Sequence, residues 1–179
     1  MKKYTFYIIG LMALIFGSCA NQESVTIKEN TEKPFFDVKG FFESEIAKSK
    51  LTKIEKTVRI NGESETQILT EFDLNKELSI FLNSDINKPS LFDKYNTFET
   101  EFSTTYKTTD KELNVQRIKI FKDKNGDFLK ILINRKADTQ IYTSDKALTY
   151  EPNVGYTIKN AQKVLLSDKK DYEIEVKFQ

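Results

Sequence analysis

Histidine and tryptophan are absent from this sequence of 179 residues, and cysteine occurs only once. Without histidine, the chain cannot form a Ser-His-Asp or Cys-His nucleophilic site, a histidine-ligated zinc centre or an imidazole pH switch. A single cysteine excludes both an intrachain disulfide and a cysteine-based metal cage. We therefore expect no metal, no cofactor and no enzymatic activity.

An excess of charge of either sign is also missing. The chain has 28 Lys and Arg residues against 27 Asp and Glu residues, which gives a formal net charge of +1. This balance leaves no basic field of the kind that attracts nucleic acid, so we expect no nucleic-acid partner. A chain of this length can bury about 70% of its unfolded surface in one domain without the help of disulfides.

The N-terminal residues 1–18 read MKKYTFYIIGLMALIFGS. Two lysines precede an almost wholly apolar run and small residues follow it, which is the pattern of a secretory signal peptide. The alternative is an uncleaved anchor helix, but a spanning helix needs about 20 apolar residues and this run is shorter. We expect residues 1–18 to be a signal peptide that is removed.

The only cysteine directly follows this segment, in the sequence Phe16-Gly17-Ser18-Cys19. This sequence resembles the lipobox of bacterial lipoproteins, although Phe16 stands where an aliphatic residue is usual. The resemblance implies a diacylglyceryl group on Cys19, cleavage before it, and acylation of the new N-terminus with a fatty acid such as palmitate. Two or more acyl chains anchor a protein stably in a membrane. The polar residues 19–33 would then be the lipidated cysteine and a flexible tether.

The lipobox, the polar tether and the Lys/Asn/Ile-rich body resemble small lipoproteins of Bacteroidota-like Gram-negative bacteria. The stretch 35–43, FFDVKGFFE, is also similar to the start of an uncharacterised family of such proteins. The resemblance implies a protein of the cell envelope. Ala20 rather than aspartate follows the cysteine, which favours the outer membrane. Residues 20–24 hold a single acid, which favours the periplasmic face over the cell surface.

Hydrophobic periodicity predicts two helices in residues 34–179, which we expect to form one domain. Apolar residues three and four positions apart predict a helix over 37–50, with Asp37 as its N-cap. The same spacing predicts a second helix over 73–87, which Pro89 would end.

Between the two helices, the dipeptide Asn61-Gly62 separates two β-prone runs and predicts a β-hairpin. A two-residue turn would place Val58 opposite Glu65, so a longer loop or a bulge is an alternative. The two strands of this hairpin are expected over 54–60 and 63–69.

From residue 95 onward the sequence reads as strands. Alternation with period two over 95–106 places Phe98, Phe102 and Tyr106 on one face of a single strand. Two further strand pairs and a final strand follow, with short connections that make neighbours antiparallel. These strands are expected over 113–122 and 128–136, over 140–150 and 156–166, and over 172–178.

These elements predict an α+β fold. We expect a long, curved antiparallel sheet of about eight strands, which could close towards a half-barrel or barrel, with two helices packed on it. A helix, a hairpin and a curved antiparallel sheet are loosely similar to the fold of Lol-type lipoprotein carriers. Such a fold analogy does not fix function.

Two acidic motifs are candidate chemical sites. The segment 123–127 alternates Asp and Asn, but its glycine is at the fourth position and not at the sixth that an EF-hand loop needs, so we interpret it as a polar hairpin turn. Glu99 and Glu101 lie two apart and could act as a glycosidase pair. Acids on one side of a charged strand are usually solvated, so we interpret these as surface residues.

Phe98, Phe102 and Tyr106 could line an apolar cup, and the competing interpretation is that they form core under the helices. Our leading hypothesis is a membrane-anchored envelope lipoprotein that acts as a non-enzymatic binding or scaffold module, attached through Cys19 and meeting another envelope protein. The second hypothesis is a carrier of an acyl chain or another apolar molecule. A hydrolase that uses carboxylates or a Ser-Lys pair ranks third.

Overall fold

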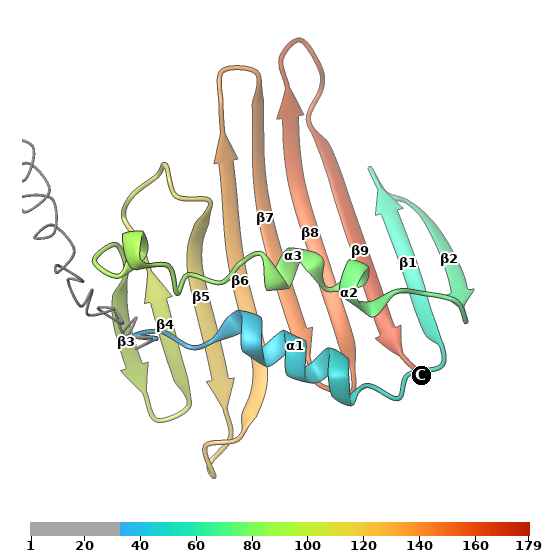
Figure 1. The fold of residues 1–179 in the computed structure, drawn as a ribbon. Coiled ribbons are helices and arrows are strands. Elements are labelled where there is room, and N and C mark those ends of the chain that lie inside the picture. Colours follow the sequence, from blue (N-terminus) through green and yellow to red (C-terminus); the bar gives the residue numbers. More distant parts are fainter. Residues whose placement is uncertain (1–32) are drawn as a thin grey trace, which may run out of the picture. The chain divides into compact units, whose positions relative to one another are not determined.

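Nine antiparallel strands form one sheet in the computed structural model, which describes residues 33–179 (Figure 1). Their order is β2-β1-β9-β8-β7-β6-β5-β4-β3, and β2 and β3 are the two edges, so the sheet is open and does not close into a barrel. The α+β prediction is confirmed. The strands are β1 (Ile54–Ile60), β2 (Glu63–Leu69), β3 (Asn96–Thr100), β4 (Ser103–Lys107), β5 (Val115–Lys122), β6 (Phe128–Asp138), β7 (Tyr142–Glu151), β8 (Gly155–Val164) and β9 (Lys170–Phe178).

All helices of the described segment lie on one face of this sheet (Figure 1). The longest is α1, where the predicted cap is confirmed because the Asp37 carboxylate accepts a hydrogen bond from the Gly40 backbone N–H at 2.9 Å. The helices are α1 (Val38–Lys48), α2 (Leu74–Glu77), α3 (Ser79–Leu82) and the short 3-10 helix η1 (Pro89–Leu91).

The second predicted helix is wrong in its length, because residues 73–87 form only the one-turn helices α2 and α3. Polar side chains after α3 bond to the local backbone. The Ser84 hydroxyl donates to the Ile80 carbonyl at 2.6 Å, and Asp85 accepts from the Asn87 N–H at 2.8 Å. Ser, Asp and Asn side chains compete in this way with helical hydrogen bonds. The apolar spacing nevertheless identified the buried side chains.

The predicted Asn61-Gly62 hairpin is confirmed with a two-residue turn. Both residues have positive φ, 50° and 97°, as a type I′ turn requires. Val58 therefore lies opposite Glu65, and the alternative of a longer loop does not occur. Glu65 stays in contact with water there, because β2 is an exposed edge strand, so the carboxylate is not desolvated.

The single strand predicted over 95–106 is wrong. It is two strands, β3 and β4, joined by a tight turn at residues 101–102. Paired residues share a face of a sheet, and Phe98 pairs with Thr105 whereas Thr97 pairs with Tyr106. The turn thus reverses the alternation, and Phe98 and Tyr106 lie on opposite faces. Alternation alone cannot distinguish a strand from a hairpin of this kind.

The core lies between the helices and the sheet. Phe42 of α1 is fully buried, with its ring centroid 5.0 Å from that of Phe81 and 4.9 Å from that of Tyr150. The Tyr150 hydroxyl also donates to the Glu45 carboxylate at 2.9 Å, which fixes α1 to β7. Fully buried aliphatic side chains from the strands complete this covered face: Ile54, Ile118, Ile120, Ile131, Ile133, Leu148 and Val176.

Candidate functional site

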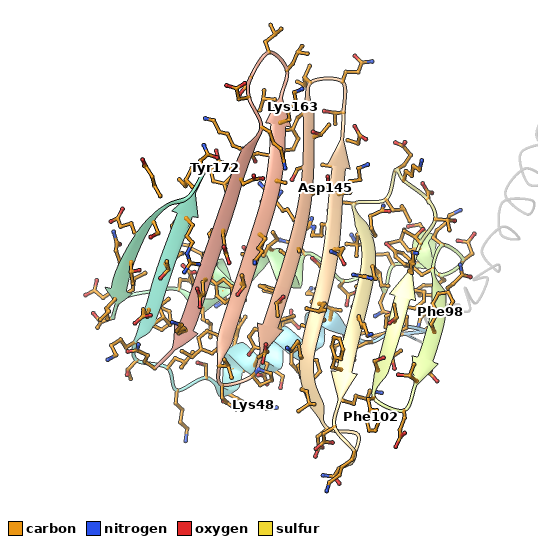
Figure 2. The ribbon with its side chains drawn as sticks, turned by 180° about the vertical axis from the view of Figure 1, so that it is seen from behind. Lys48, Phe98, Phe102, Asp145, Lys163 and Tyr172 are labelled. Carbon is orange, nitrogen blue, oxygen red and sulfur yellow. The ribbon has the colours of Figure 1, made fainter. Side chains whose placement is uncertain are left out.

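The opposite face of the sheet, which we call the open face, bears no helix of residues 33–179 (Figure 2). Its side chains are those that alternate with the core residues along each strand. The strand register sets them in rows across the sheet. One row runs over five strands through Asn134, Ala147, Lys159, Glu173 and Arg59.

The centre of the open face has small side chains, which we call the central trough. On β7 and β8, Thr149 pairs with Thr157, and Gly155 pairs with Glu151. Lys159 stands between Thr157 and Ala161 on the same face of β8 and divides the trough in two, and long charged side chains on the neighbouring strands border both parts. The trough residues are Ala147, Thr149, Gly155, Thr157 and Ala161.

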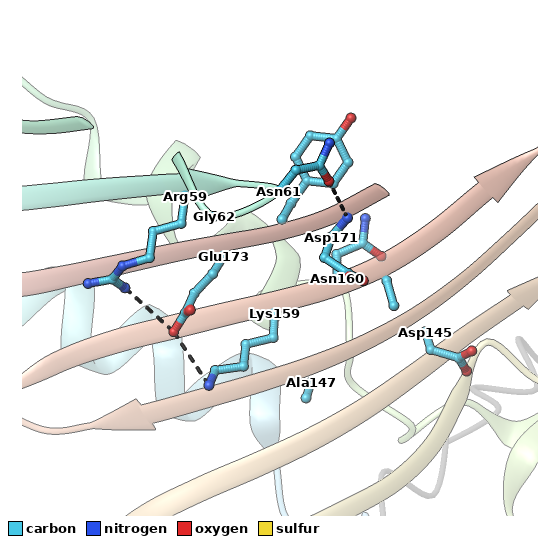
Figure 3. A pocket seen from close by; sticks show the side chains of 11 residues that line it. Arg59, Asn61, Gly62, Asp145, Ala147, Lys159, Asn160, Asp171 and Glu173 are labelled. Atoms are coloured by element: carbon cyan, nitrogen blue, oxygen red, sulfur yellow. Dashed lines mark hydrogen bonds and ion pairs between the residues drawn. The ribbon is translucent and has the colours of Figure 1, made fainter. Parts of the chain in front are cut away.

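A hollow of about 370 Å³ lies at one end of the trough, beside the Asn61-Gly62 turn (Figure 3). Glu173 holds two cations across the strands: its Oε1 is 3.6 Å from Arg59 Nη1 and 3.4 Å from Lys159 Nζ. The Asp145 carboxylate approaches the same hollow from β7. The hollow therefore presents both signs of charge around a floor that includes Ala147.

A second hollow, of about 510 Å³, lies at the other end of the trough. Lys177 Nζ stands on its border, 3.4 Å from Glu55 Oε1 and 3.8 Å from Glu175 Oε1. Its floor depends on Gly155, which has φ of +145° and lies so close to β9 that an added Cβ would collide with the Val176 carbonyl oxygen. Only glycine fits this position, because it combines left-handed backbone with close approach of another strand.

The β3–β6 half of the open face is cationic. Arg117 Nε donates to Asn134 Oδ1 at 3.0 Å, and Lys119 Nζ lies 4.7 Å from the centre of the Phe121 ring, a cation–π contact. Within the described part of the chain, two of its cations have carboxylate partners: Lys130 pairs with Glu151 at 3.0 Å, and Lys136 pairs with Asp138 at the end of β6 at 3.4 Å. The cations of this half, called the cationic half below, are Lys107, Arg117, Lys119, Lys130 and Lys136.

A separate hollow of about 500 Å³ lies on the helix side, between the sheet and α2–α3. Its lining includes the apolar side chains of Ile80, Ile158 and Ile174. At its base, Lys56 Nζ lies 2.9 Å from both carboxylate oxygens of Glu77. The Glu77 carboxylate also accepts a hydrogen bond from the hydroxyl of Tyr156, whose pKa burial raises well above its ordinary value.

The sequence-predicted cup residues are not brought together. Phe98 and Phe102 are 56% and 49% exposed, at the β3–β4 hairpin (Figure 2). Tyr106 is buried on the other face, where its ring centroid lies 5.3 Å from that of Phe35 and its hydroxyl accepts from the Phe36 N–H at 3.0 Å. The predicted lipidation site, Cys19, lies outside the described residues.

The acidic segment 123–127 is a polar hairpin turn, as predicted. Asp123 Oδ1 accepts from the N–H groups of Asn125 and Asp127 at 2.8 and 2.9 Å. Glu99 lies on β3 and Glu101 in the turn that follows, so the two acids do not share a strand. Over residues 33–179, no group of three or more acidic, His or Cys side chains is arranged to hold a metal ion.

Sequence reasoning missed the central trough. Its signal is present as small residues at alternate positions of β7 and β8, interrupted by Lys159, but such residues indicate a trough only once the two strands are known to be neighbours in register. No helix of the described segment is long and apolar enough to cross a membrane. In comparisons with known proteins, no family model, no curated protein and no solved structure matches the chain.

Proposed function

We propose that this chain is a membrane-anchored lipoprotein of the cell envelope, and that its domain is a non-enzymatic binding module that uses the open face. The observation that supports the binding role is a sheet face without a covering layer in the described chain, with a central trough between charged borders. The core needs only the covered face, so the pattern of the open face is free to serve recognition. The lipobox at Cys19 supports the anchor, Ala20 supports the outer membrane, and the single acid in residues 20–24 supports its periplasmic side.

The chemistry of the open face favours a polar partner with negative charge. Arginine and lysine on the cationic half can bond to anionic oxygens, and the small residues of the trough let an extended chain approach the backbone. Most of these charges are partly solvated, which suits selection of a partner more than tight apolar burial. An acidic segment of another envelope protein has this chemistry.

Site-specific photo-crosslinking in intact envelopes tests this role. A photoreactive residue at Thr157, inside the trough, should give one discrete adduct of defined mass. Adding Arg117→Glu and Lys119→Glu should remove that adduct, because both changes reverse charge on the cationic half. The matched control is a photoreactive residue at the exposed Asn75 of α2, on the other side. Equal adducts from both positions, or an adduct insensitive to charge reversal, would contradict the proposal.

The anchor and the non-enzymatic role have separate tests. Cys19→Ala should leave a precursor that no longer takes up labelled fatty acid, and continued labelling would refute lipidation. A reproducible hydrolase activity that one Ser or Glu substitution abolishes would refute the non-enzymatic role.

The alternative, a carrier of an acyl chain, has one observation in its favour. The hollow between the sheet and α2–α3 combines apolar Ile158 and Ile174 with the lysine side chains of Lys76 and Lys146, which suits an aliphatic chain with a carboxylate head. Native mass spectrometry of protein purified from a periplasm should then show an extra mass that Ile174→Asp removes. A bare mass under conditions that retain an added fatty acid would exclude this alternative.

A further inference from the structure

We propose that an apolar tip at one end of the sheet inserts into an anionic lipid bilayer. Its residues are Ile141 in the β6–β7 loop and Val164, Leu165 and Leu166 at the end of β8 and in the loop after it. All are exposed, from Val164 at 45% to Leu166 at 99%. A cluster of aliphatic side chains at such exposure marks an interaction site, because each side chain lacks the favourable free energy that removal from water would give.

The tip is one structural unit although two loops build it. The backbone N–H of Leu165 donates to the carbonyl of Ile141 at 2.8 Å, so the loops are held side by side. In Figure 1 the β6–β7 and β8–β9 hairpins project beyond the other loops at that end of the sheet. A projecting, convex apolar tip can enter a deformable bilayer directly, whereas a protein partner would need a groove already shaped to it.

The backbone at the tip holds Leu166 in an unusual conformation. Its φ is +62°, in the left-handed region that glycine or asparagine normally occupies, and the Ser167 N–H closes the turn on the Val164 carbonyl at 3.0 Å. Leucine here is unfavourable for the backbone and gains no burial within the domain. A residue that opposes stability in both respects points to a role outside the fold.

Lysines flank the apolar residues and match the charge of anionic headgroups. Lys163 precedes the tip, at the end of the sheet seen in Figure 2, and Lys169 and Lys170 follow it. Asp168 precedes Lys169, which pairs with Asp171 at 3.3 Å, whereas no ion pair within residues 33–179 involves Lys163 or Lys170. An apolar segment bordered by free ammonium groups is the pattern of surfaces that lie in the interface of an anionic membrane.

The tip is compatible with the proposed anchor but does not depend on it. Lys33 lies fourteen positions after Cys19 in the sequence, and a chain of that length extends to at most about 50 Å. The longest strand, β6, has 11 residues, or about 36 Å at the rise of an extended strand. An anchor at Cys19 therefore allows the tip to reach the same bilayer.

A fluorescence experiment without the anchor tests the tip alone. The mature chain with Cys19→Ser has no thiol, so Ser167→Cys provides a single site for an environment-sensitive dye. With vesicles that contain one part phosphatidylglycerol to about two parts phosphatidylcholine, the dye emission should shift to the blue, and quenchers attached to the lipid acyl chains should reduce it. The same dye on Asn125→Cys, at a turn at the other end of the sheet, should show neither effect.

Two variants test the apolar side chains and distinguish lost membrane binding from a folding defect. Leu165→Asp with Leu166→Asp should weaken partitioning by about tenfold or more, because two aliphatic side chains are lost from the bilayer. Leu166→Gly should weaken it less while relieving the left-handed backbone, so its fold is at least as stable. Absence of lipid quenching in the unmutated tip, or equal quenching in the double Asp variant, would overturn the proposal. A blue shift that follows protein concentration without lipid quenching would overturn it in favour of self-association.

Discussion

The two faces of the same strands differ in what they contribute. On β6, Ile131 and Ile133 are completely buried under the helices, while their neighbours Leu132 and Asn134 lie on the open face. Alternate residues of one strand thus serve a packed core and a solvated surface. The covered face contains large apolar side chains whose burial stabilises the fold, and the open face contains mostly polar, charged and small side chains, few of which the core requires.

Residues that stabilise the fold and residues that are available for recognition therefore lie on opposite faces of the sheet. Substitutions on the covered face should change folding first, whereas substitutions on the open face should change binding with little effect on folding.

Ile133→Ala and Leu132→Ala compare adjacent aliphatic residues on the two faces. Ile133→Ala should lower the free energy of unfolding by about 3 kcal/mol, because it leaves a cavity in a fully buried site. Leu132→Ala should cost about 1 kcal/mol or less, since its side chain already contacts water. Urea unfolding of both variants measures the comparison, and equal losses would show that the open face is covered in solution.

Gly155→Ala tests an open-face position that the fold itself constrains. The change should cost about 2 kcal/mol, because alanine must adopt a positive φ and its Cβ meets the β9 backbone. Gly126→Ala is the matched control: it also has a positive φ, +87°, but nothing lies within 4 Å of an added Cβ. It should cost about 1 kcal/mol. Thermal unfolding distinguishes the two, and an equally small cost at Gly155 would refute the close approach of β8 and β9.

Burial of Tyr95 on the covered side should make the free energy of unfolding depend on pH in alkaline solution. Burial raises its pKa to about 12, while an unfolded tyrosine has a pKa of about 10. The folded state thus favours the neutral hydroxyl, which donates to the Val115 carbonyl at 2.6 Å. Its stabilising contribution is complete below pH 10 and is lost as the pH rises through the folded pKa of about 12.

Tyr95→Phe isolates this contribution. At pH 8 it should cost about 1 kcal/mol, the value of one buried hydrogen bond. Near pH 11 the variant should equal or exceed the native chain, because it has no phenol to ionise there. Guanidinium unfolding at the two pH values measures the change in sign, and a deficit that stays constant would contradict the raised pKa.

Lys159→Ala should have the smallest effect on folding. Its ion pair with Glu173 is solvated, so the loss should be within about 0.5 kcal/mol. The same change should weaken the Thr157 crosslink severalfold, because Lys159 borders the first hollow. Calorimetry and adduct yield together test the separation, and a variant that loses stability without losing the adduct would break it.

The sequence predicted local features wherever a few neighbouring residues decide the structure. Asp37 identified a helix start, and Asn61-Gly62 identified a turn whose type requires positive φ. The turn after Thr100 was missed, because the residues on both sides alternate as one strand would. The central trough and the apolar tip were missed for another reason: each joins segments that only the strand register or a loop contact brings together, as with Leu165 and Ile141.

The central claim is that the open face is occupied in the cell envelope, and lysine footprinting tests it most directly. Lys159 on the open face and Lys39 on α1 have nearly equal side-chain exposure, 65% and 64%. In the purified protein, an acetylating reagent should therefore modify both lysines at similar rates. In intact envelopes, we predict that Lys159 becomes severalfold less reactive while Lys39 does not change. Equal reactivity of both lysines in envelopes and in purified protein, or protection of Lys39 alone, would contradict the account.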